Sequence, residues 1–247
     1  MVALILAAGY GTRLYPLTQE TPKALLPAKD RPILQHLIEK LISPALGIQE
    51  LIFVSNHRYA SAFEEWLGRS NLSIRWRLLD DGSTSEENRL GSIGDLIFTV
   101  RAAKIDADLL VVGSDNLFQD PLGGFLQFAK EKSPALTVGV HELTDLTQAR
   151  RYGVLQVDKE WRIVDFQEKP PKPTSPFIST AIYFFPRRTL PRVSEYAAAP
   201  GGNQDTLGSF IHWLIHQEKV YAYRLQGSWF DIGGIDSYQN AKEQFTP

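Results

Sequence analysis

The sequence LILAAGYGTRL at residues 4–14 decides the fold of this chain. Its apolar start predicts a buried strand, and the two glycines after it predict a loop where the backbone can approach a ligand. A loop at the carboxyl end of a parallel strand presents backbone N–H groups that suit phosphate. Arg13 in this stretch and Lys23 beyond it add cations that bind phosphate oxygens. These residues therefore predict a triphosphate-binding loop.

Two well-known phosphate loops do not fit this stretch. The dinucleotide-binding fingerprint needs a third glycine at the position that Leu14 occupies. The P-loop needs a Gly-Lys-Ser/Thr tripeptide after its glycines, and the sequence contains none. The loop must therefore belong to another class.

The stretch resembles the opening of the sugar-phosphate nucleotidyltransferases, also called nucleoside-diphosphate-sugar pyrophosphorylases. Their motif L-A-(G/A)-G-x-G-T-R-L precedes a Pro-Lys pair, which stands here at residues 22–23 before Ala-Leu-Leu-Pro. The resemblance implies catalytic roles for Arg13 and Lys23, and nucleotide contacts from residues of the loop, which are Leu6, Ala8, Gly9, Gly11, Thr12 and Arg13. The alternative is an ordinary strand–turn–helix junction with two incidental cations, which the specificity of the motif disfavours.

The composition is that of an ordinary globular protein. The chain has 247 residues, 43% of them hydrophobic and 22% charged. A net charge of −2 provides no electrostatic basis for binding nucleic acid or an anionic membrane. The absence of cysteine excludes disulfides and thiolate chemistry. No apolar run is long enough to span a membrane, and the apolar start lacks a basic leader, so we expect a cytoplasmic protein.

Strand and helix patterns alternate along the first half of the chain. Short apolar runs at residues 51–54, 72–79 and 108–112 predict strands, and apolar residues at helical spacing over 33–41 and 63–67 predict helices. We expect an α/β fold, a Rossmann-like mixed and mostly parallel sheet flanked by helices, with a small β-rich sugar-binding portion. One domain would span residues 1–247, with the nucleotide held mainly by 1–134 and the sugar phosphate mainly by 135–247.

A second glycine-containing segment, LGSIGDL, occupies residues 90–96. It resembles the L-G-T-A-G-A-L segment of the family, in which glycines lie against the base, and this implies a nucleotide contact at Gly91. Ile93 and Asp95 depart from the small residues of the family. The alternative is a plain glycine at the start of a helix.

Two aspartates are predicted to bind Mg²⁺. Asp115 follows an apolar strand in GSDN, which resembles the Gly-Asp metal step of the family, and Asp231 lies in WFDIG, which resembles its W-x-D-x-G element. Carboxylate oxygens are suitable ligands for this hard cation. The alternative role for either aspartate is the capping of a helix that follows it.

The run RYGV at residues 151–154, with EKP at 168–170, resembles the sugar-phosphate site of the family. The resemblance implies that Gly153 lies under the sugar ring, that Glu168 accepts hydrogen bonds from sugar hydroxyls, and that Lys169 binds the sugar phosphate. Thr180, in a segment similar to the x-T-G-x-Y-x-F strand, becomes a further sugar contact. Ala181 replaces the glycine of that pattern.

His212 and His216 are four residues apart on a predicted helix, a spacing that can hold a metal. Metal sites need three or four converging ligands, and the sequence offers no third ligand nearby. We therefore expect a structural pair at the surface or at the edge of the core.

The resemblance implies Mg²⁺-dependent condensation of a nucleoside triphosphate with a sugar 1-phosphate, releasing pyrophosphate. YPLT at residues 15–18 favours dTTP or UTP with glucose 1-phosphate. A cytidylyltransferase for a non-sugar phosphate such as phosphocholine, and a non-catalytic nucleotide-sensing subunit, remain alternatives. A homo-oligomer is compatible with the resemblance, and we expect no hexapeptide-repeat module after residue 247.

Overall fold

The computed structural model of the chain describes residues 1–203 and 205–246. Its helices are α1 (Ile33–Leu41), α2 (His57–Arg69), α3 (Gly91–Ala102), α4 (Gly123–Lys132), α5 (Leu190–Ala198), α6 (Leu207–Leu214) and α7 (Ile235–Gln244). Its strands are β1 (Val2–Leu6), β2 (Pro27–Ala28), β3 (Arg31–Pro32), β4 (Glu50–Ser55), β5 (Arg75–Asp80), β6 (Leu109–Gly113), β7 (Asn116–Phe118), β8 (Leu136–Glu142), β9 (Gly153–Val157), β10 (Ile163–Glu168), β11 (Phe177–Phe185), β12 (Val220–Arg224) and β13 (Trp229–Asp231).

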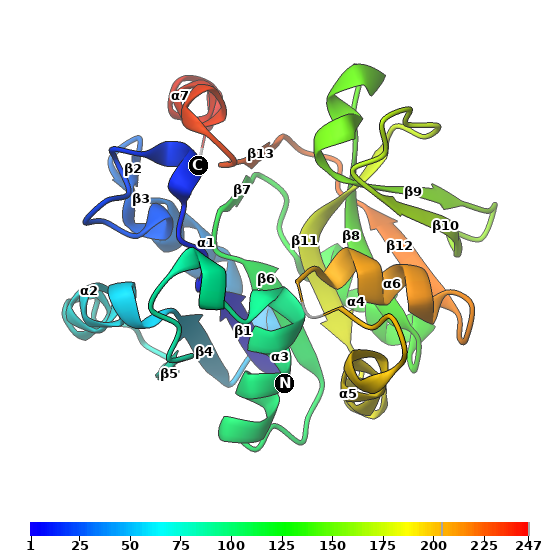
Figure 1. Cartoon of the computed structure of the whole chain (residues 1–247), viewed down its shortest axis with the longest axis horizontal. Helices are drawn as coiled ribbons and strands as arrows, with labels where there is room; N and C mark the ends of the chain where they lie inside the picture. Colours follow the sequence, from blue (N-terminus) through cyan, green and yellow to red (C-terminus); the bar gives the residue numbers. More distant parts are fainter. Residues whose placement is uncertain (204, 247) are drawn as a thin grey trace.

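Nine strands form one sheet that extends across both halves of the molecule (Figure 1). β6, β1, β4 and β5 are neighbours in that order and all parallel. β11 is antiparallel to β6 and joins this part to β8, β9, β10 and β12. The sheet is therefore parallel in the first half and mixed in the second, which confirms the predicted fold class.

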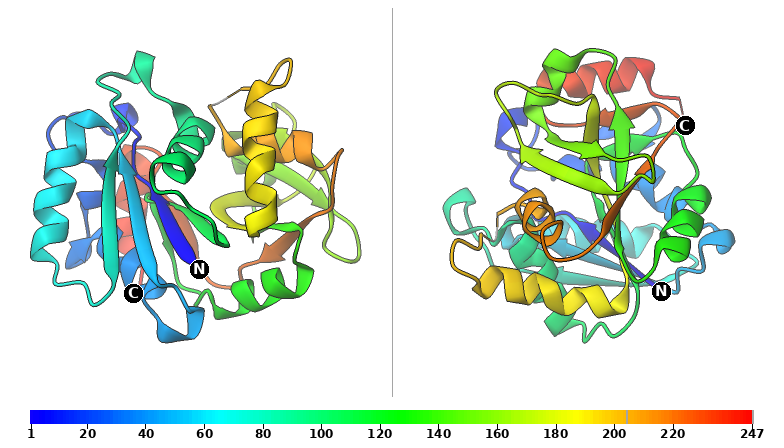
Figure 2. Two further views of the ribbon diagram at one scale, coloured as in Figure 1. Left: turned by 90° about the horizontal axis from the view of Figure 1, so that it is seen from below. Right: turned by 90° about the vertical axis from the view of Figure 1, so that its right-hand side faces the viewer.

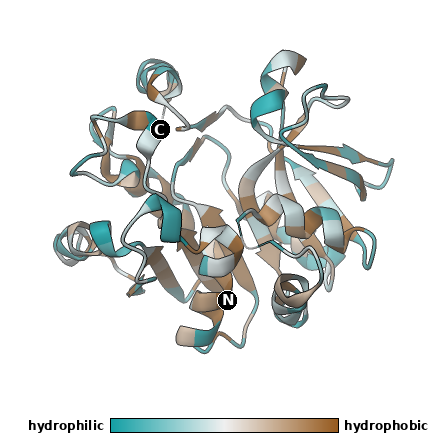
Figure 3. Cartoon of the chain, in the orientation of Figure 1, coloured by the Kyte–Doolittle hydropathy of each residue, from teal (hydrophilic) through white to brown (hydrophobic). Residues whose placement is uncertain are grey.

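Alternating side chains of β1 face two separate layers of helices. Ala3 and Ile5 belong to the core cluster that α1, α2 and α4 cover, whereas Leu4 belongs to the cluster with α3, α5 and α6. Because both faces of β1 are buried under helices, apolar residues follow one another along the strand without alternating with polar ones. Helices lie on both sides of the sheet in Figure 2, and the central strands are the most hydrophobic part of the chain in Figure 3.

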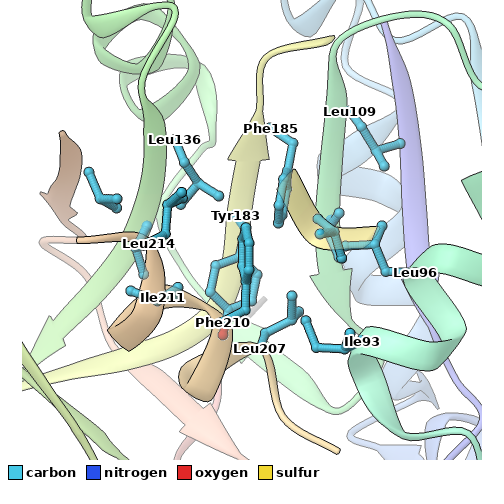
Figure 4. Packing of buried hydrophobic residues seen from close by; sticks show 14 of the residues in the cluster. Ile93, Leu96, Leu109, Leu136, Tyr183, Phe185, Leu207, Phe210, Ile211 and Leu214 are labelled. Atoms are coloured by element: carbon cyan, nitrogen blue, oxygen red, sulfur yellow. The ribbon is translucent and has the colours of Figure 1, made fainter. Parts of the chain in front are cut away.

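The core between the two halves is formed by α3, α6 and β11. Leu207, Phe210 and Leu214 of α6 pack in one buried cluster with Tyr183 of β11 and Ile93 of α3 (Figure 4). Phe210 stacks on Phe185 at a ring-centroid distance of 6.1 Å. This packing fixes the position of α6 relative to the first half of the chain.

β7 and β13 form a small two-stranded sheet that is separate from the main sheet. β13 pairs antiparallel with β7, and Asp231 lies opposite Asn116 in the register. Figure 1 shows these two strands between the halves, with α7 next to β13. The carboxyl ends of β1 and β6 meet the same region, which is where ligands bind in open α/β sheets.

Two local predictions differ from the structure. The strand expected over 72–79 begins only at Arg75. The small residues at 197–203 predict a linker, but its first two residues lie in α5, a helix that the sequence pattern did not predict. The sequence leaves it open whether Asn116 is a turn residue, and the structure has it as the first residue of β7. Each departure depends on tertiary packing, which a local pattern does not encode.

Ala181 adopts a left-handed backbone with φ of 56°, at the position where the family pattern has glycine. It lies where the pairing of β11 with β8 shifts, between Ser179 and Tyr183. A left-handed conformation costs a residue other than glycine roughly 1–2 kcal/mol. Glycine avoids this cost, but its greater freedom in the unfolded chain offsets part of the gain in stability.

We therefore expect Ala181→Gly to raise the free energy of unfolding by about 1 kcal/mol, measured by urea titration. Ala222→Gly is the matched control, because Ala222 is buried in regular strand β12 and its replacement should lower stability. Equal losses in the two variants would contradict the expectation for Ala181.

Candidate functional site

A cleft of about 430 Å³ lies between the two halves of the chain. Its lining includes most of the residues that the sequence motifs singled out, from both halves. These are Leu6, Arg13, Asp115, Gly153, Glu168, Lys169, Thr180 and Asp231. The structure thus brings together segments that are more than 200 residues apart in sequence.

The loop after β1 is held from several sides. Gly11 has φ of 63°, and its carbonyl accepts a hydrogen bond of 2.7 Å from the hydroxyl of Thr18. The side chain of Asn56, at the end of β4, donates to the carbonyl of Ala8 at 2.9 Å. Gly9 lies between these anchors, and Thr12 follows Gly11. The anchored loop leads directly into the short helix Thr12–Leu14, which places Arg13 at the cleft.

The second glycine segment forms the start of α3. Gly91 is the first helical residue, with φ of 76°, and Ser92 next to it lines the cleft. The predicted nucleotide contact at Gly91 therefore lies at the cleft's edge and stays a prediction. Asp95, which departs from the family pattern, points away from the cleft lining into a buried position.

Lys23 and Asp115 contact each other. The Nζ atom of Lys23 lies 2.6 Å from Oδ2 of Asp115, and both side chains are largely buried. The resemblance implies a catalytic role for Lys23 and a metal-binding role for Asp115. The structure shows the two side chains as an ion pair, so a cation bound to Oδ2 of Asp115 would compete with Lys23.

Asp231 is half-buried in the cleft wall, in the same region as Asp115. The Ile232 amide donates to the Asp115 carbonyl at 3.1 Å, which ties β13 to the end of β6. Burial and then the negative charge of Asp115 raise the pKa of Asp231 to about 6. The positive charges of Lys23, Arg13 and Lys169 act in the opposite direction. Both aspartates therefore belong to one electrostatic cluster, and neither caps the helix that follows it.

This pair of aspartates fits a magnesium ion that also binds the substrate. Within residues 1–203 and 205–246 no group of three or more His, Cys, Asp or Glu side chains is placed to hold a metal. Mg²⁺ in phosphate-handling sites is commonly bound by one or two carboxylates together with substrate phosphates. A two-carboxylate site with cations around it matches that donor set.

Glu168 and Phe166 fill the space between two glycines. A Cβ atom at Gly153 would overlap the ring of Phe166, and one at Gly208 would overlap the carboxylate of Glu168. Both positions therefore require glycine. Burial raises the pKa of Glu168, and its carboxylate remains on the cleft wall where it could accept from a hydroxyl.

Lys169 has a left-handed backbone with φ of 45°, and its amide donates to the Tyr152 carbonyl at 3.0 Å. Its Nζ atom lies 3.8 Å from Glu168, and 61% of its side chain is exposed. The ammonium therefore extends into the cleft. Thr180 is different, since it is fully buried and its hydroxyl donates to the carbonyl of Gly139 at 2.8 Å.

Sequence reasoning did not assign a role to Asn116 or Trp229. The Nε1 atom of Trp229 donates to Oδ1 of Asn116 at 2.7 Å. The side-chain nitrogen of Asn116, Nδ2, lies 3.4 Å from Oδ1 of Asp115. Trp229 also packs edge-on against Tyr152 at a centroid distance of 5.4 Å. This network orients the acidic pair and joins it to the sugar side. In the sequence, the one indication of this network is that the residue directly after Asp115 is polar, namely Asn116.

We expect Asn116→Ala to lower turnover roughly 10–100-fold, as for other residues that orient metal-binding side chains. Trp229→Phe, which removes the donor N–H together with part of the ring, should cause a smaller loss in the same direction. Pyrophosphate release measured over a range of Mg²⁺ concentrations tests this, because the variants should need more Mg²⁺ for half-maximal release. An unchanged metal dependence in Asn116→Ala would contradict the role.

The two histidines are exposed and lie next to each other at the end of α6. Nδ1 of His212 donates to the carbonyl of Phe166 at 2.7 Å, and the ring centroids of His212 and His216 are 5.3 Å apart. In the part of the chain that the structure describes, no third metal-binding side chain joins them.

Comparison with known proteins places this geometry in a family. The family model for nucleotidyl transferases matches residues 2–246. The bifunctional protein GlmU of Methanocaldococcus jannaschii is 29% identical over 94% of this chain, and that of Methanococcus maripaludis strain S2 is 28% identical over 94%. The chain spans about half of each of these relatives, 51% of their length.

Solved structures show the same fold. A Bacillus anthracis protein assigned as a glucose-1-phosphate thymidylyltransferase superposes with a TM-score of 0.82 at 23% identity, covering 98% of this chain and 94% of the other. A UDP-glucose pyrophosphorylase complexed with UDP-glucose gives a TM-score of 0.81 at 20% identity, with 98% of both chains covered.

Among the described residues, no helix is long and apolar enough to cross a membrane.

Proposed function

Because the chain belongs to the nucleotidyl transferase family, we propose that it condenses a nucleoside triphosphate with a sugar 1-phosphate. The observation that carries this proposal is the cleft itself. It joins Arg13 at the end of a phosphate-type loop, two half-buried aspartates and the Glu168–Lys169 pair in one space. A binding protein would have no need for both the acidic pair and the cations opposite it.

The proposed reaction is an in-line displacement at the α-phosphorus. An oxygen of the sugar phosphate forms the new P–O bond, and the bond to the β-phosphate oxygen breaks, so that pyrophosphate leaves with the electron pair. The nucleophile is already an anion near neutral pH and needs no general base. Catalysis then depends on positioning two polyanions and neutralising their charge.

The residues of the cleft divide this work. Arg13 and the loop amides would hold the pyrophosphate, Lys23 the α-phosphate, and Lys169 the incoming phosphate. Asp115 and Asp231 would hold Mg²⁺, which supplies charge neutralisation on the phosphate oxygens when bound. When Lys23 leaves Asp115, its ammonium becomes available to the substrate that replaces the ion pair.

The sugar and base identities are proposed from the sequence and the fold. dTTP or UTP with glucose 1-phosphate is the leading pair. It is supported by YPLT at residues 15–18 and by the presence of Gly153 and Glu168 in the cleft lining. Phosphocholine is the main competing acceptor. It has no ring hydroxyls for Glu168, whose burial next to the cleft would then have no purpose.

Pyrophosphate release tests the proposal directly. The common nucleoside triphosphates are assayed against glucose 1-phosphate, N-acetylglucosamine 1-phosphate, mannose 1-phosphate and phosphocholine, with Mg²⁺ or with EDTA. We expect metal-dependent release in one sugar-phosphate combination. Nucleotide binding without release in any combination would favour the non-catalytic alternative instead.

A further inference from the structure

Ser92 forms three hydrogen bonds to a segment of the other half of the chain. The carbonyl of Asp205 accepts from the Ser92 amide at 2.8 Å and from the Ser92 hydroxyl at 3.1 Å. The amide of Leu207 donates to the same hydroxyl oxygen at 2.9 Å. Arg89, just before α3, adds an ion pair of 2.6 Å to the carboxylate of Asp205. The start of α3 and the segment before α6 are thus joined directly.

The Leu207 contact meets a specific requirement of α6. Leu207 is the first residue of this helix, and the first N–H groups of a helix have no partner inside it. Thr206 caps the helix locally by accepting from the Ser209 amide. Ser92 supplies the acceptor for Leu207 from 115 positions away in the sequence. One end of α6 is therefore stabilised by the nucleotide segment of the chain.

The next residue of α6 contacts the sugar side of the cleft. The absent Cβ of Gly208 is what allows the carboxylate of Glu168 to lie against the helix. A shift of the α6 start would consequently move the support of Glu168. Leu207 and Ile93 also lie side by side in the packed core of Figure 4. Because close-packed side chains transmit displacement, we expect a movement of α3 to be passed on to α6.

We propose that Ser92 is a positioning residue that couples nucleotide binding at the start of α3 to the sugar-phosphate side of the cleft. This inference rests on the proposed function. A nucleotide that orders Gly91 and Ser92 orders the first turn of α6, and with it Gly208 and Glu168. Two sites coupled in this way raise each other's affinity by the same factor.

Hydrogen exchange provides a readout that is independent of turnover. In the wild-type chain we expect the α,β-methylene analogue of UTP with Mg²⁺ to slow exchange of the amides at the start of α6, Leu207 above all. Ser92→Ala should remove this protection, and Ser92→Thr should restore it because the hydroxyl returns. Ser209→Ala is the comparison variant, since its hydroxyl contacts the Thr206 cap within the first turn of α6 and lies apart from the contact with Ser92 of α3. It should alter the local exchange rates but keep the protection by nucleotide.

The binding cycle measures the coupling itself. The Kd of glucose 1-phosphate is determined with and without the saturating UTP analogue, which cannot transfer its nucleotidyl group. We expect nucleotide to tighten sugar-phosphate binding in the wild-type chain. We expect Ser92→Ala to reduce that factor about tenfold, by weakening the Kd measured with nucleotide much more than the Kd measured without it. A merely structural role would weaken both Kd values equally.

The possible outcomes separate this inference from the function on which it rests. Coupling and α6 protection that are both lost in Ser92→Ala and restored in Ser92→Thr support it. If turnover and binding of both substrates are present but Ser92→Ala retains the wild-type coupling, the inference is overturned and the function stands. If every nucleotide and sugar phosphate of the assay fails to bind, both are overturned.

Discussion

Replacing Lys169 with alanine is expected to lower turnover about a hundredfold, as for other positioned charges that stabilise a transition state. The ammonium lies 3.8 Å from Glu168, and its charge reaches Asp231 at the centre of the cleft. In the proposed reaction it would hold the incoming phosphate next to the α-phosphate. The exposed side chain makes no core contact, so its removal should leave stability unchanged.

The test of Lys169 is a steady-state measurement of pyrophosphate release with the best substrate pair. Lys172→Ala is the control, because this lysine lies three positions further along the same exposed stretch and outside the cleft lining. We expect kcat of the control to equal that of the wild type. Near-normal turnover of Lys169→Ala on every accepted sugar phosphate would refute its role.

The sequence predicts the first half of the fold because its signals are local. The apolar run at residues 2–6 forms a strand that is buried on both faces, and the glycines follow it where the chain must turn. The positive φ of Gly11 and Gly91 shows that these two glycines are needed for backbone reasons. Motif spacing predicted the segments of the cleft because each lies at the end of a strand or the start of a helix.

The arrangement around the aspartates could not be predicted in the same way. β7 and β13 have three residues each, and they form only because each finds the other across more than a hundred positions. Strands this short carry little periodicity of their own. Asn116 and Trp229 acquire their contact from this pairing, and so does the proximity of Asp231 to Asp115.

Two residues that depart from the family pattern have structural consequences that the sequence did not reveal. Ala181 retains the left-handed backbone that glycine would occupy, and β11 changes its pairing there. Asp95 lies on α3 at a position that the core covers, with only 6% of the residue exposed. A carboxyl on a helix is expected at the surface, so its burial follows from the packing of α3 alone.

The burial of Asp95 predicts a large pH effect on stability. Burial first, and then the negative charge of Asp81, raise the pKa of Asp95 to about 8 from an ordinary value of 3.8. In the described part of the chain, Oδ1 of Asp95 and Oδ2 of Asp81 have no hydrogen-bond donor. Ionisation of Asp95 in the folded protein would bury a negative charge next to the carboxylate of Asp81, without a hydrogen-bond donor for Oδ1 of Asp95.

The direction follows from proton linkage. Between about pH 4 and pH 8 the folded chain keeps the proton on Asp95 and the unfolded chain loses it, so stability falls as the pH rises through this window. The slope reaches about 1.4 kcal/mol per pH unit for one proton, which gives roughly 2–3 kcal/mol between pH 5 and pH 7. Asp95→Asn stays neutral and can donate to Asp81, so it should remove this slope.

Urea unfolding of the wild-type chain and Asp95→Asn at pH 5, 6, 7 and 8 tests this expectation. Because other groups titrate in the same range, the informative quantity is the difference between the two proteins at each pH. That difference should be small at pH 5 and should grow in favour of Asp95→Asn as the pH rises. Glu64→Gln, at an exposed carboxyl on α2, should show no such growth. A difference that is constant from pH 5 to pH 8 would mean that Asp95 does not hold a proton in the folded state.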